Sequence, residues 1–475
     1  MAAEIDRRSI WLLLIVKGRR MLFFLALLLL FWYIVNIPVP EGLTPAGRNA
    51  IAIFFLCLIL WVSNVIPLAI TSLFAIVLVP LLDVLPRKEV YGLFGNEAVF
   101  FILGAFILGG AVMHSGLSNR IALTIMERFG GSPRRLVLSV YLLSAVLSFF
   151  MSEHAVAAML FPIVLEITKS LGLKPGASGY GKILFLSLAW GCVIGGVATF
   201  LGGARVPLAA GMLREITGKT FDFFSYTAAV FPLVLVMLPV GYFILTRAFP
   251  MDVESVEKVH GFLEKRIRAI GKVSYTEYAV GLVLILTVIA WATVGRITGL
   301  ATIALVSVVV LFIFRLVRWK DIEEYVNWGV ILMYGGAIIM GTALERSGAA
   351  LWIAERAFGG GVVSPWAAIA FFSLFALLLT EGMSNAAVIA ILLPVGIGLT
   401  QRFSMDPRIV AYSIAIPAGL AFALPVSTPA NAIALSSNYI TVSDMAKLGI
   451  IMTLISWVVF NLVARFYWPL VGLGY

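Results

Sequence analysis

Long apolar runs recur along the whole chain, and they constrain its fold more than any other feature. Crossing the hydrocarbon core of a bilayer takes about 20 apolar residues in a helix. Of the 475 residues, 61% are hydrophobic and 12% are charged, which is about half the charged fraction of soluble proteins. The sequence therefore predicts an all-α polytopic membrane protein without a separate soluble domain. The eleven predicted spans lie near residues 21–39, 47–63, 66–83, 98–115, 182–208, 225–247, 278–296, 300–317, 329–344, 409–440 and 447–470.

Two further apolar stretches, 134–171 and 364–402, carry polar residues in their middle. Non-helical backbone at membrane depth is tolerated only where protein or a water-filled cavity covers it. We therefore expect each stretch to form a re-entrant helical hairpin, which dips into the membrane and returns to the side it entered from.

Basic residues indicate the orientation. The formal net charge is +10, from 34 Lys and Arg against 24 Asp and Glu, and the cations lie in short loops between apolar runs. This is the positive-inside pattern rather than a nucleic-acid surface. We expect a multi-pass protein of the cell (inner or plasma) membrane with a cytoplasmic N-terminus and, after eleven crossings, an external C-terminus. Four cations remain outside in this topology: Arg214, Lys219, Arg402 and Arg408.

The strongest internal signal is a repeat. MSEHAVAAMLFP begins at Met151 and MSNAAVIAILLP begins at Met383, which is 232 residues later (383 − 151), and Ser115 and Ser347 have the same offset. The first copy is entered from inside and the second from outside, so we predict an inverted-topology repeat with a binding site near the bilayer midplane. The predicted divisions are a first repeat over 1–248 with its hairpin at 134–171, a cytoplasmic connector over 249–277, and a second repeat over 278–475 with its hairpin at 364–402.

Four polar clusters interrupt apolar sequence in the two halves. Half-helix N-termini there would offer backbone N–H groups to an anion, and carbonyl oxygens would ligate a cation. Amides and hydroxyls would hold a carboxylate or a sulfate without burying a strong positive charge. The clusters are Ser152-Glu153-His154 and Gly202-Gly203-Ala204-Arg205 in the first half, and Thr380-Glu381 with Ser384-Asn385 and Ser427-Thr428-Pro429-Ala430-Asn431 in the second half.

At these motifs the sequence resembles a known family. MSEHAVAAMLFP and TEGMSNAAVIAILLP are similar to the two Ser-Asn-Thr hairpin motifs of the divalent-anion/sodium symporters, which move dicarboxylates, citrate or sulfate. SNVIPLAITSLFAIVLVPLL (63–82) and FFILGAFILGG (100–110) resemble early spans of that family, and ALPVSTPANAIA (423–434) resembles its second broken helix. The resemblance covers most of the chain.

The resemblance implies a homodimer whose scaffold and transport domains move substrate by an elevator-like motion, with one sodium site beside each hairpin tip and the substrate between the tips. Carried over by position, Ser152 and Ser384 are implied to contact the substrate. The other candidate substrate-binding residues are His154, Arg205, Asn385, Thr428 and Pro429. The first sodium site would use Ser148, Ser152 and backbone near Gly196, and the second would use Thr380, Asn385, Met383 and backbone from Ala423 to Ser427.

The first hairpin departs from the family pattern. Glu153 and His154 stand in place of Asn and Thr, and Gly203-Ala204-Arg205-Val206 stands where the first broken helix usually reads Thr-Pro-Pro-Asn; the second hairpin has Ala386 for Thr. An ionisable group at bilayer depth costs at least ~2.5–3.5 kcal/mol on insertion scales, so three of them near one tip require pairing. Our hypothesis is that Glu153 and Arg205 pair, and that this fixed cation replaces the first sodium.

Under this hypothesis His154 donates to the substrate or titrates during the cycle, and sodium coupling is loosened to obligate exchange, proton coupling or a single sodium at the second site. Two alternatives remain for the cluster. The pair is a structural lock of the hairpin, or Arg205 faces the substrate and clamps a carboxylate or a sulfate bidentately. Glu381 is expected to be a buried hydrogen-bond partner rather than a ligand.

Other features favour a secondary carrier over other classes. No GxGxxG or Walker pattern points to ATP, and Cys57 and Cys192 read as buried small hydrophobes. We expect no cofactor, no metal beyond sodium and no nucleic-acid partner. The alternatives are an anion channel and an intramembrane enzyme using Ser152 with His154, although residues two apart on a helix point apart. C4-dicarboxylates such as succinate or malate are the first choice of substrate, and sulfate and citrate follow.

Overall fold

The computed structural model describes residues 10–63, 65–358, 364–403 and 405–473, and these form helices and no strand. Within these described ranges, eight helical segments are long and apolar enough to cross a membrane, and four shorter apolar helices accompany them. The prediction of an all-α polytopic membrane protein is thereby confirmed. The eight segments are Pro45–Ser63, Arg87–His114, Gly179–Gly196, Phe223–Ala248, Tyr275–Thr293, Trp328–Arg346, Pro365–Gly382 and Val442–Phe466.

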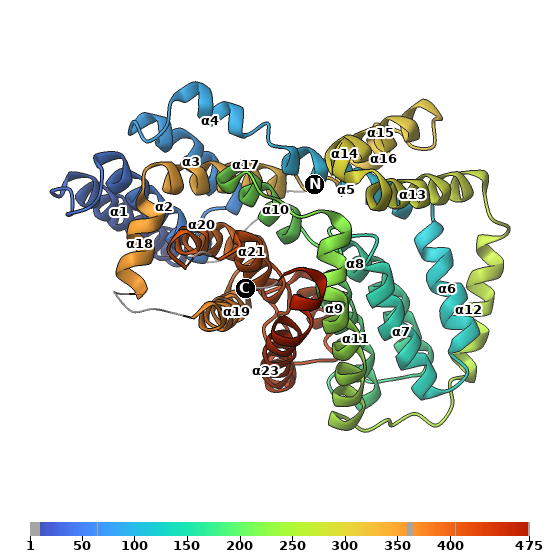
Figure 1. Ribbon diagram of the computed structural model, residues 1–475. Helices are drawn as coiled ribbons and strands as arrows, with labels where there is room; N and C mark the ends of the chain where they lie inside the picture. The colour runs from blue at the N-terminus through green and yellow to red at the C-terminus, as the bar shows by residue number, and fades with distance from the viewer. Residues whose placement is uncertain (1–9, 64, 359–363, 404, 474–475) are drawn as a thin grey trace.

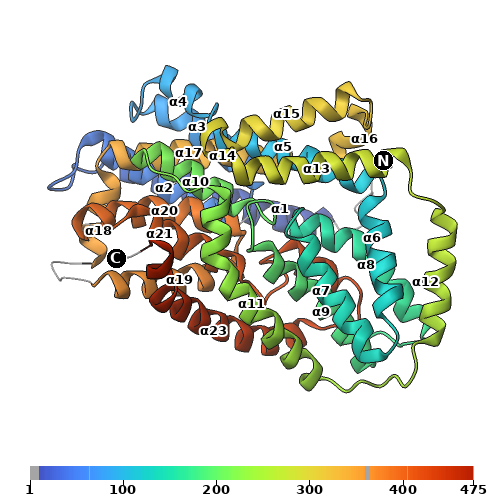
Figure 2. The ribbon, with the colours of Figure 1, turned by 45° about the vertical axis from the view of Figure 1, so that its right-hand side comes forward.

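One layer of helices runs across the top of both ribbon views (Figures 1 and 2). Within it α3 packs on α17 and α5 packs on α15. Gly336 allows α3 and α17 to approach closely, since a Cβ at this position would lie only 2.4 Å from the Cβ of Ser72. The layer consists of α2 (Pro45–Ser63), with α1 (Ile10–Asn36) packed on it, α3 (Leu68–Leu81), α4 (Arg87–Leu93), α5 (Glu97–His114), α13 (Tyr275–Thr293), α14 (Gly295–Thr298), α15 (Leu300–Ile313), α16 (Trp319–Ile322), η1 (Glu323–Tyr325) and α17 (Trp328–Arg346).

A second layer lies beneath the first in both views. Helices α7 and α9 pack tightly, since a Cβ on Gly195 would lie 2.1 Å from the carbonyl oxygen of Ala145. Helix α10 joins the layers by contacting α17, α5 and α20. The second layer consists of α7 (Pro133–Leu147), α8 (Glu153–Ser170), α9 (Gly179–Gly196), α10 (Arg205–Thr217), α11 (Phe223–Ala248), α19 (Pro365–Gly382), α20 (Asn385–Phe403), α21 (Pro407–Ala415), η2 (Pro417–Gly419), α22 (Pro429–Leu435), α23 (Val442–Phe466) and η3 (Trp468–Val471).

Three amphipathic helices flank these layers: α6 (Leu117–Phe129), α12 (Glu257–Ile270) and α18 (Ala349–Phe358). Helix α12 lies inside the stretch 249–277 that we expected to be a polar connector. It packs on α6 and α8, and the buried Val259 and Leu263 lie one helical turn apart on its inner face. The connector is therefore partly a packed helix.

The sequence repeat is visible in the helix bounds. Helices α7 and α19 begin at Pro133 and Pro365, and α8 and α20 begin at Glu153 and Asn385, so both pairs keep the offset of 232 residues. The local chemistry matches as well. A serine precedes each of these four helices, and its hydroxyl accepts a hydrogen bond from the backbone N–H three residues later, which caps the helix.

Two predicted spans, 182–208 and 409–440, are broken helices. The first stops at Gly196 and resumes at Arg205, and the second is interrupted between Ala415 and Pro429 by the short helix η2 and an irregular loop. Pro429 takes the first position of α22, where its missing N–H costs no hydrogen bond. The two hairpins turn between α7 and α8 and between α19 and α20.

Candidate functional site

The first hairpin tip packs against the first helix break. The Glu153 N–H donates to the carbonyl of Gly202 (3.0 Å), and the Thr199 hydroxyl donates to the carbonyl of Phe149 (2.7 Å). A Cβ on Gly196 would lie 2.7 Å from Glu153 Oε2. Glycine at position 196 therefore leaves the space that the Glu153 carboxylate fills.

Arg205, the first residue of α10, lies beside this carboxylate. Its Nη1 is 3.8 Å from Glu153 Oε2, and the two side chains are 1% and 7% exposed. This separation is short enough for an ion pair but too long for a direct hydrogen bond. Four buried polar groups have no hydrogen-bond partner among the residues that the structure describes: Glu153 Oε2, Arg205 Nε, Arg205 Nη2 and the hydroxyl of Ser148. The first tip is thus a buried ion pair with unsatisfied polar groups around it.

The guanidinium of Arg205 lies between two glycines. A Cβ on Gly203 would lie 2.3 Å from Nη1, and a Cβ on Gly419 would lie 2.2 Å from Nε. Gly419 belongs to η2 of the second half, so this arginine reaches across the boundary between the repeats. Tyr334 of α17 donates its hydroxyl hydrogen to the carbonyl of Ala204, which fixes the residue before Arg205.

The second hairpin tip is built from neutral oxygens. The buried Thr380 hydroxyl lies 2.7 Å from the carbonyl of Ala418, and one terminal atom of the Asn385 amide lies 2.8 Å from that hydroxyl and 3.2 Å from each of the carbonyls of Ala418 and Ser427. With nitrogen turned inward, the Asn385 amide donates to these oxygens. If the amide oxygen of Asn385 faces inward instead, it converges with the hydroxyl oxygen of Thr380 and the carbonyl oxygens of Ala418 and Ser427. Oxygens converge in the same way in the carbonyl-rich sodium sites of transporters.

Glu381 joins the second hairpin to the second break. Its carboxylate accepts hydrogen bonds from the backbone N–H groups of Phe422, Ala423 and Leu424 (3.0–3.1 Å) and from the hydroxyl of Thr453 (2.9 Å). The contacts match the role of hydrogen-bond partner that the sequence indicated.

Asn431 closes the loop of the second break from the other side. Its Nδ2 donates to the carbonyls of Ala421 (3.1 Å) and Leu424 (3.2 Å) and to the hydroxyl of Ser427 (3.2 Å). An irregular backbone segment is therefore held in one conformation by two side chains, Glu381 and Asn431.

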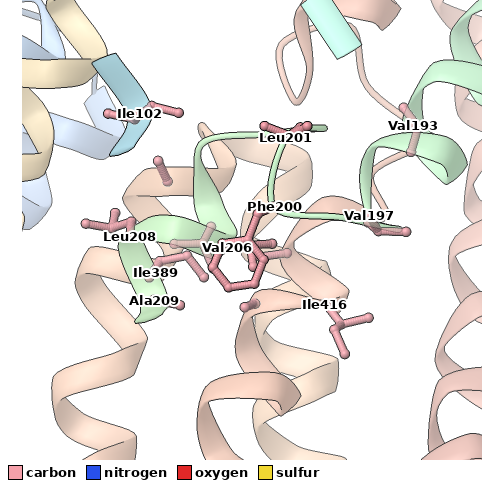
Figure 3. Close-up of a cluster of buried hydrophobic side chains, with 14 of the residues drawn as sticks. Ile102, Val193, Val197, Phe200, Leu201, Val206, Leu208, Ala209, Ile389 and Ile416 are labelled. Atoms are coloured by element: carbon pink, nitrogen blue, oxygen red, sulfur yellow. The ribbon is translucent and has the colours of Figure 1, made fainter. Parts of the chain in front are cut away.

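The two tips are linked by a short path of contacts. Glu153 faces Arg205, Arg205 lies against Gly419, and the preceding Ala418 carbonyl lies against Asn385. Buried apolar side chains from both halves also pack together, and Figure 3 shows Val206, which follows Arg205 in sequence, and Phe200 close to Ile389 of the second half. The broken elements of the two repeats therefore meet in the interior of the protein.

A small, partly open cavity of about 30 Å³ lies at the first tip. It is lined by Ser152 and Ala155, by Gly203 and Ala204 of the break, and by α5 and Tyr325 of the other layer. One water molecule occupies about 30 Å³ in the liquid, so the cavity is too small for a dicarboxylate. Arg205 and Glu153 do not line it.

A wider hollow of about 580 Å³ opens between α5, α10, α14 and the start of α11. Phe101 and Phe200 line the hollow, and the residues that follow them in sequence, Ile102 and Leu201, line the small cavity. The rings of Phe101 and Phe200 form an edge-to-face pair with their centroids 5.9 Å apart.

Ion pairs at the wider hollow connect the two layers. Arg214 pairs with Glu97, and Arg296 pairs with Asp222 at 2.8 Å. Burial disfavours ionisation of Asp222, but hydrogen bonds from Ser225 and Arg296 outweigh that effect and hold its pKa below its usual range.

The remaining predicted site residues take different positions. His154 is exposed in the first turn of α8, and Met383 is buried in the tip of the second hairpin. Thr428 is buried and caps α22 by accepting the Asn431 N–H (3.2 Å). Ser152 Oγ accepts from the N–H of Ala155, which gives it a capping role rather than a contact with His154.

Sequence reasoning missed several contributors. Ala418 supplies a carbonyl beside Asn385 that the prediction did not include, next to the carbonyl of Ser427, which it did include. Gly419 and Tyr334 were also missed, although the Pro417-Ala418-Gly419 triplet was a sign of broken backbone. Nothing in the sequence marked Tyr325.

Comparison with known proteins gives matches along nearly the whole chain. A family model described as the sodium:sulfate symporter transmembrane region matches residues 19–473. The sodium-dependent dicarboxylate transporter SdcS of Staphylococcus saprophyticus is 30% identical, over 90% of this chain and 88% of its own length. The protein of the same name from Staphylococcus aureus is 29% identical, over 91% and 88%.

Two solved transporter structures share the fold. The YdaH transporter of Alcanivorax borkumensis aligns with a TM-score of 0.54 at 16% identity, covering 80% of this chain and 88% of that one. MtrF of Neisseria gonorrhoeae aligns with a TM-score of 0.57 at 14% identity, covering 95% and 94%. At these identities the likeness concerns the fold alone.

Proposed function

The chain belongs to the sodium:sulfate symporter family, and we propose on this premise that it is a secondary transporter of small divalent anions, with C4-dicarboxylates such as succinate or malate as the first choice. The similar Staphylococcus proteins are named sodium-dependent dicarboxylate transporters, which supports this class of substrate. Sulfate and citrate are the alternatives. The protein resides in the cell membrane with its N-terminus in the cytoplasm and works as a homodimer.

The observation that carries the proposal is the path from Glu153 through Arg205, Gly419 and Ala418 to Asn385, which brings the two tips together. Ser152 and Ser384 precede α8 and α20, so the N-terminal ends of two helices belong to this region. Helix N-termini stabilise anions through unpaired N–H groups and the helix dipole. A dianion can engage one tip with each of its two charged ends.

The oxygens of the second tip fit a sodium ion. Thr380, Asn385 and the carbonyls of Ala418 and Ser427 would hold it, and the ion would supply positive charge beside the anion. Glu381 acts indirectly, since its hydrogen bonds to the Phe422–Leu424 backbone position the loop that carries Ser427.

Movement of one layer relative to the other gives the substrate access. The cavity at Ser152 is too small for a dicarboxylate and is lined on one side by α5 and Tyr325, so these groups must separate from the first tip during each cycle. An elevator-like displacement of the layer that carries both hairpins accomplishes this, with the wider hollow beside Phe101 and Phe200 as one route of entry.

Counterflow in proteoliposomes tests the proposed function. Vesicles preloaded with unlabelled succinate should accumulate labelled succinate in a saturable manner, and malate outside should compete. Protein-free vesicles are the control, and sulfate and citrate replace succinate in parallel arms. Flux that neither saturates nor shows counterflow would indicate a channel, and absence of transport for all four anions would overturn the proposal.

A further inference from the structure

We infer that Arg205 is a built-in cation that takes the place of a mobile cation at the first hairpin tip, so that each protomer binds one sodium ion, at the second tip. The inference rests on the proposed function insofar as the second tip binds sodium. Its evidence is the difference between two positions that the repeat makes equivalent.

The offset of 232 residues identifies the equivalent groups. Thr380 corresponds to Ser148, and Asn385 corresponds to Glu153. Both members of each pair stand at the same place in their hairpin, one at the end of the first arm and one at the start of the second. The first tip therefore keeps the hydroxyl of the second tip and has a carboxylate where the second tip has an amide.

The charge on the two sets of ligands is different. At the second tip the hydroxyl, the amide and the two carbonyls are neutral, so any positive charge must arrive with an ion. At the first tip the carboxylate of Glu153 already faces the guanidinium of Arg205 at 3.8 Å, and both are buried. A buried carboxylate requires a cation nearby, and here the chain itself provides it.

The surrounding backbone is shaped for this guanidinium. Gly203 and Gly419 flank it so closely that a side chain on either would collide with it, and Gly196 leaves space for the carboxylate. A sodium ion at the same place would meet a like charge in a buried, weakly screened environment, which is strongly unfavourable. The residues of the first tip therefore do not fit a sodium ion while Arg205 is present.

The position of Arg205 also argues against its use as a substrate clamp. It is 1% exposed, and the cavity beside Ser152 is lined by Gly203 and Ala204 but not by Arg205. The guanidinium points instead toward Glu153 and Gly419.

One consequence concerns the charge carried by the loaded protein. The Glu153–Arg205 pair is neutral as a whole, so a dianion bound with a single sodium leaves one negative charge on the transported load. The transport rate should accordingly depend on the sodium concentration to the first order. A membrane potential that is negative inside should slow uptake, because each step inward carries one net negative charge.

Sodium binding to the purified protein tests the inference without depending on transport. Equilibrium binding of radioactive sodium should give one site per protomer in the wild type and none in T380A/N385A. The double variant E153N/R205V converts the first tip to the chemistry of the second and should gain a second site. R268A, which removes an arginine from an exposed ion pair with Glu264 on α12, is the control and should keep one site.

Two sodium ions per protomer in the wild type would overturn the inference whether or not the variants fold. Unchanged sodium binding in T380A/N385A would also overturn it. Size-exclusion chromatography establishes whether each variant is folded, and if E153N/R205V is not, the wild-type count decides. Succinate counterflow is measured on the same preparations, so that loss of the proposed function is distinguished from a wrong sodium count.

Discussion

The second hairpin tip and the first are copies of one module, yet they satisfy their polar groups in different ways. At the second tip Thr380, Asn385 and two carbonyls contact one another, and Glu381 has four hydrogen-bond donors. At the first tip Glu153 and Arg205 face each other at 3.8 Å with polar atoms left unpaired. One tip is assembled from neutral groups and accepts a charge, whereas the other contains two opposite charges of its own.

This difference shows how a duplicated fold can become functionally asymmetric through a few residues. The first residues of the hairpin helices and their serine caps keep the same offset in both repeats of this chain. The positions that follow the caps, and the residue at the start of α10, are where the halves diverge. Changes of this kind alter ion binding without altering the scaffold.

The largest effect is expected from R205M, which leaves the carboxylate of Glu153 buried and unpaired. Removing one partner of a buried ion pair costs about 3–5 kcal/mol, so the melting temperature in detergent should fall strongly. The double variant E153Q/R205M removes both charges and should recover most of the loss. If R205M melts like the wild type, the pair is not a buried, coupled unit.

A smaller loss is expected from E381Q at the second hairpin. Hydrogen bonds to a charged group contribute about 1.5–3 kcal/mol, and the neutral amide cannot accept from all three backbone N–H groups and Thr453 as well. T453V removes only one of these donors and should cost less. A larger drop in melting temperature for T453V than for E381Q would contradict this account of the loop.

T380V probes the sodium ligands themselves. Loss of one buried hydroxyl costs about 1 kcal/mol. The stabilisation of the protein by sodium relative to choline should also disappear, because an ion that binds only the folded protein stabilises it according to the ratio of its concentration to its Kd, and loss of a ligand raises that Kd. S148A, the equivalent change at the first tip, should leave the sodium effect intact. If sodium stabilises T380V and S148A to the same extent, the proposed difference in sodium binding between the two tips is wrong.

The smallest loss of stability is expected at the exposed ion pair of Arg296 and Asp222. This pair is the comparison for the buried pair of Glu153 and Arg205. R296A should cost less than about 1 kcal/mol because Arg296 is largely exposed to solvent. The pKa of Asp222 is lowered in the folded protein, so its contribution is present above the ordinary aspartate pKa and is lost as the pH falls through the lowered value. Unfolding measured across that acidic range should show a weaker pH dependence in R296A than in the wild type.

Much of the fold was predictable because helices in lipid must be long and apolar. The repeat offset located both hairpins, and the polar interruptions located both breaks. The helix α12 was not predicted, because its apolar residues Val259 and Leu263 are separated by charges that mask the period. The helices α4 and α18 were also missed, because they are too short to be recognised as membrane spans.

The site was only partly predictable. Glu153, Arg205, Thr380 and Asn385 stood out because polar groups in apolar sequence require partners. Ala418 and Tyr325 did not, because a backbone carbonyl and a residue brought in from the other layer leave no mark on the sequence. Whether Arg205 would point to Glu153 or into a substrate cavity also depended on the packing of Gly203 and Gly419.

Succinate binding to S152A and S384A tests most directly whether the two repeats share one anion pocket. By isothermal titration calorimetry the wild type should bind one succinate per protomer, and each substitution should weaken that same site. Two independent succinate sites per protomer, or affinity unchanged by either substitution, would contradict the account.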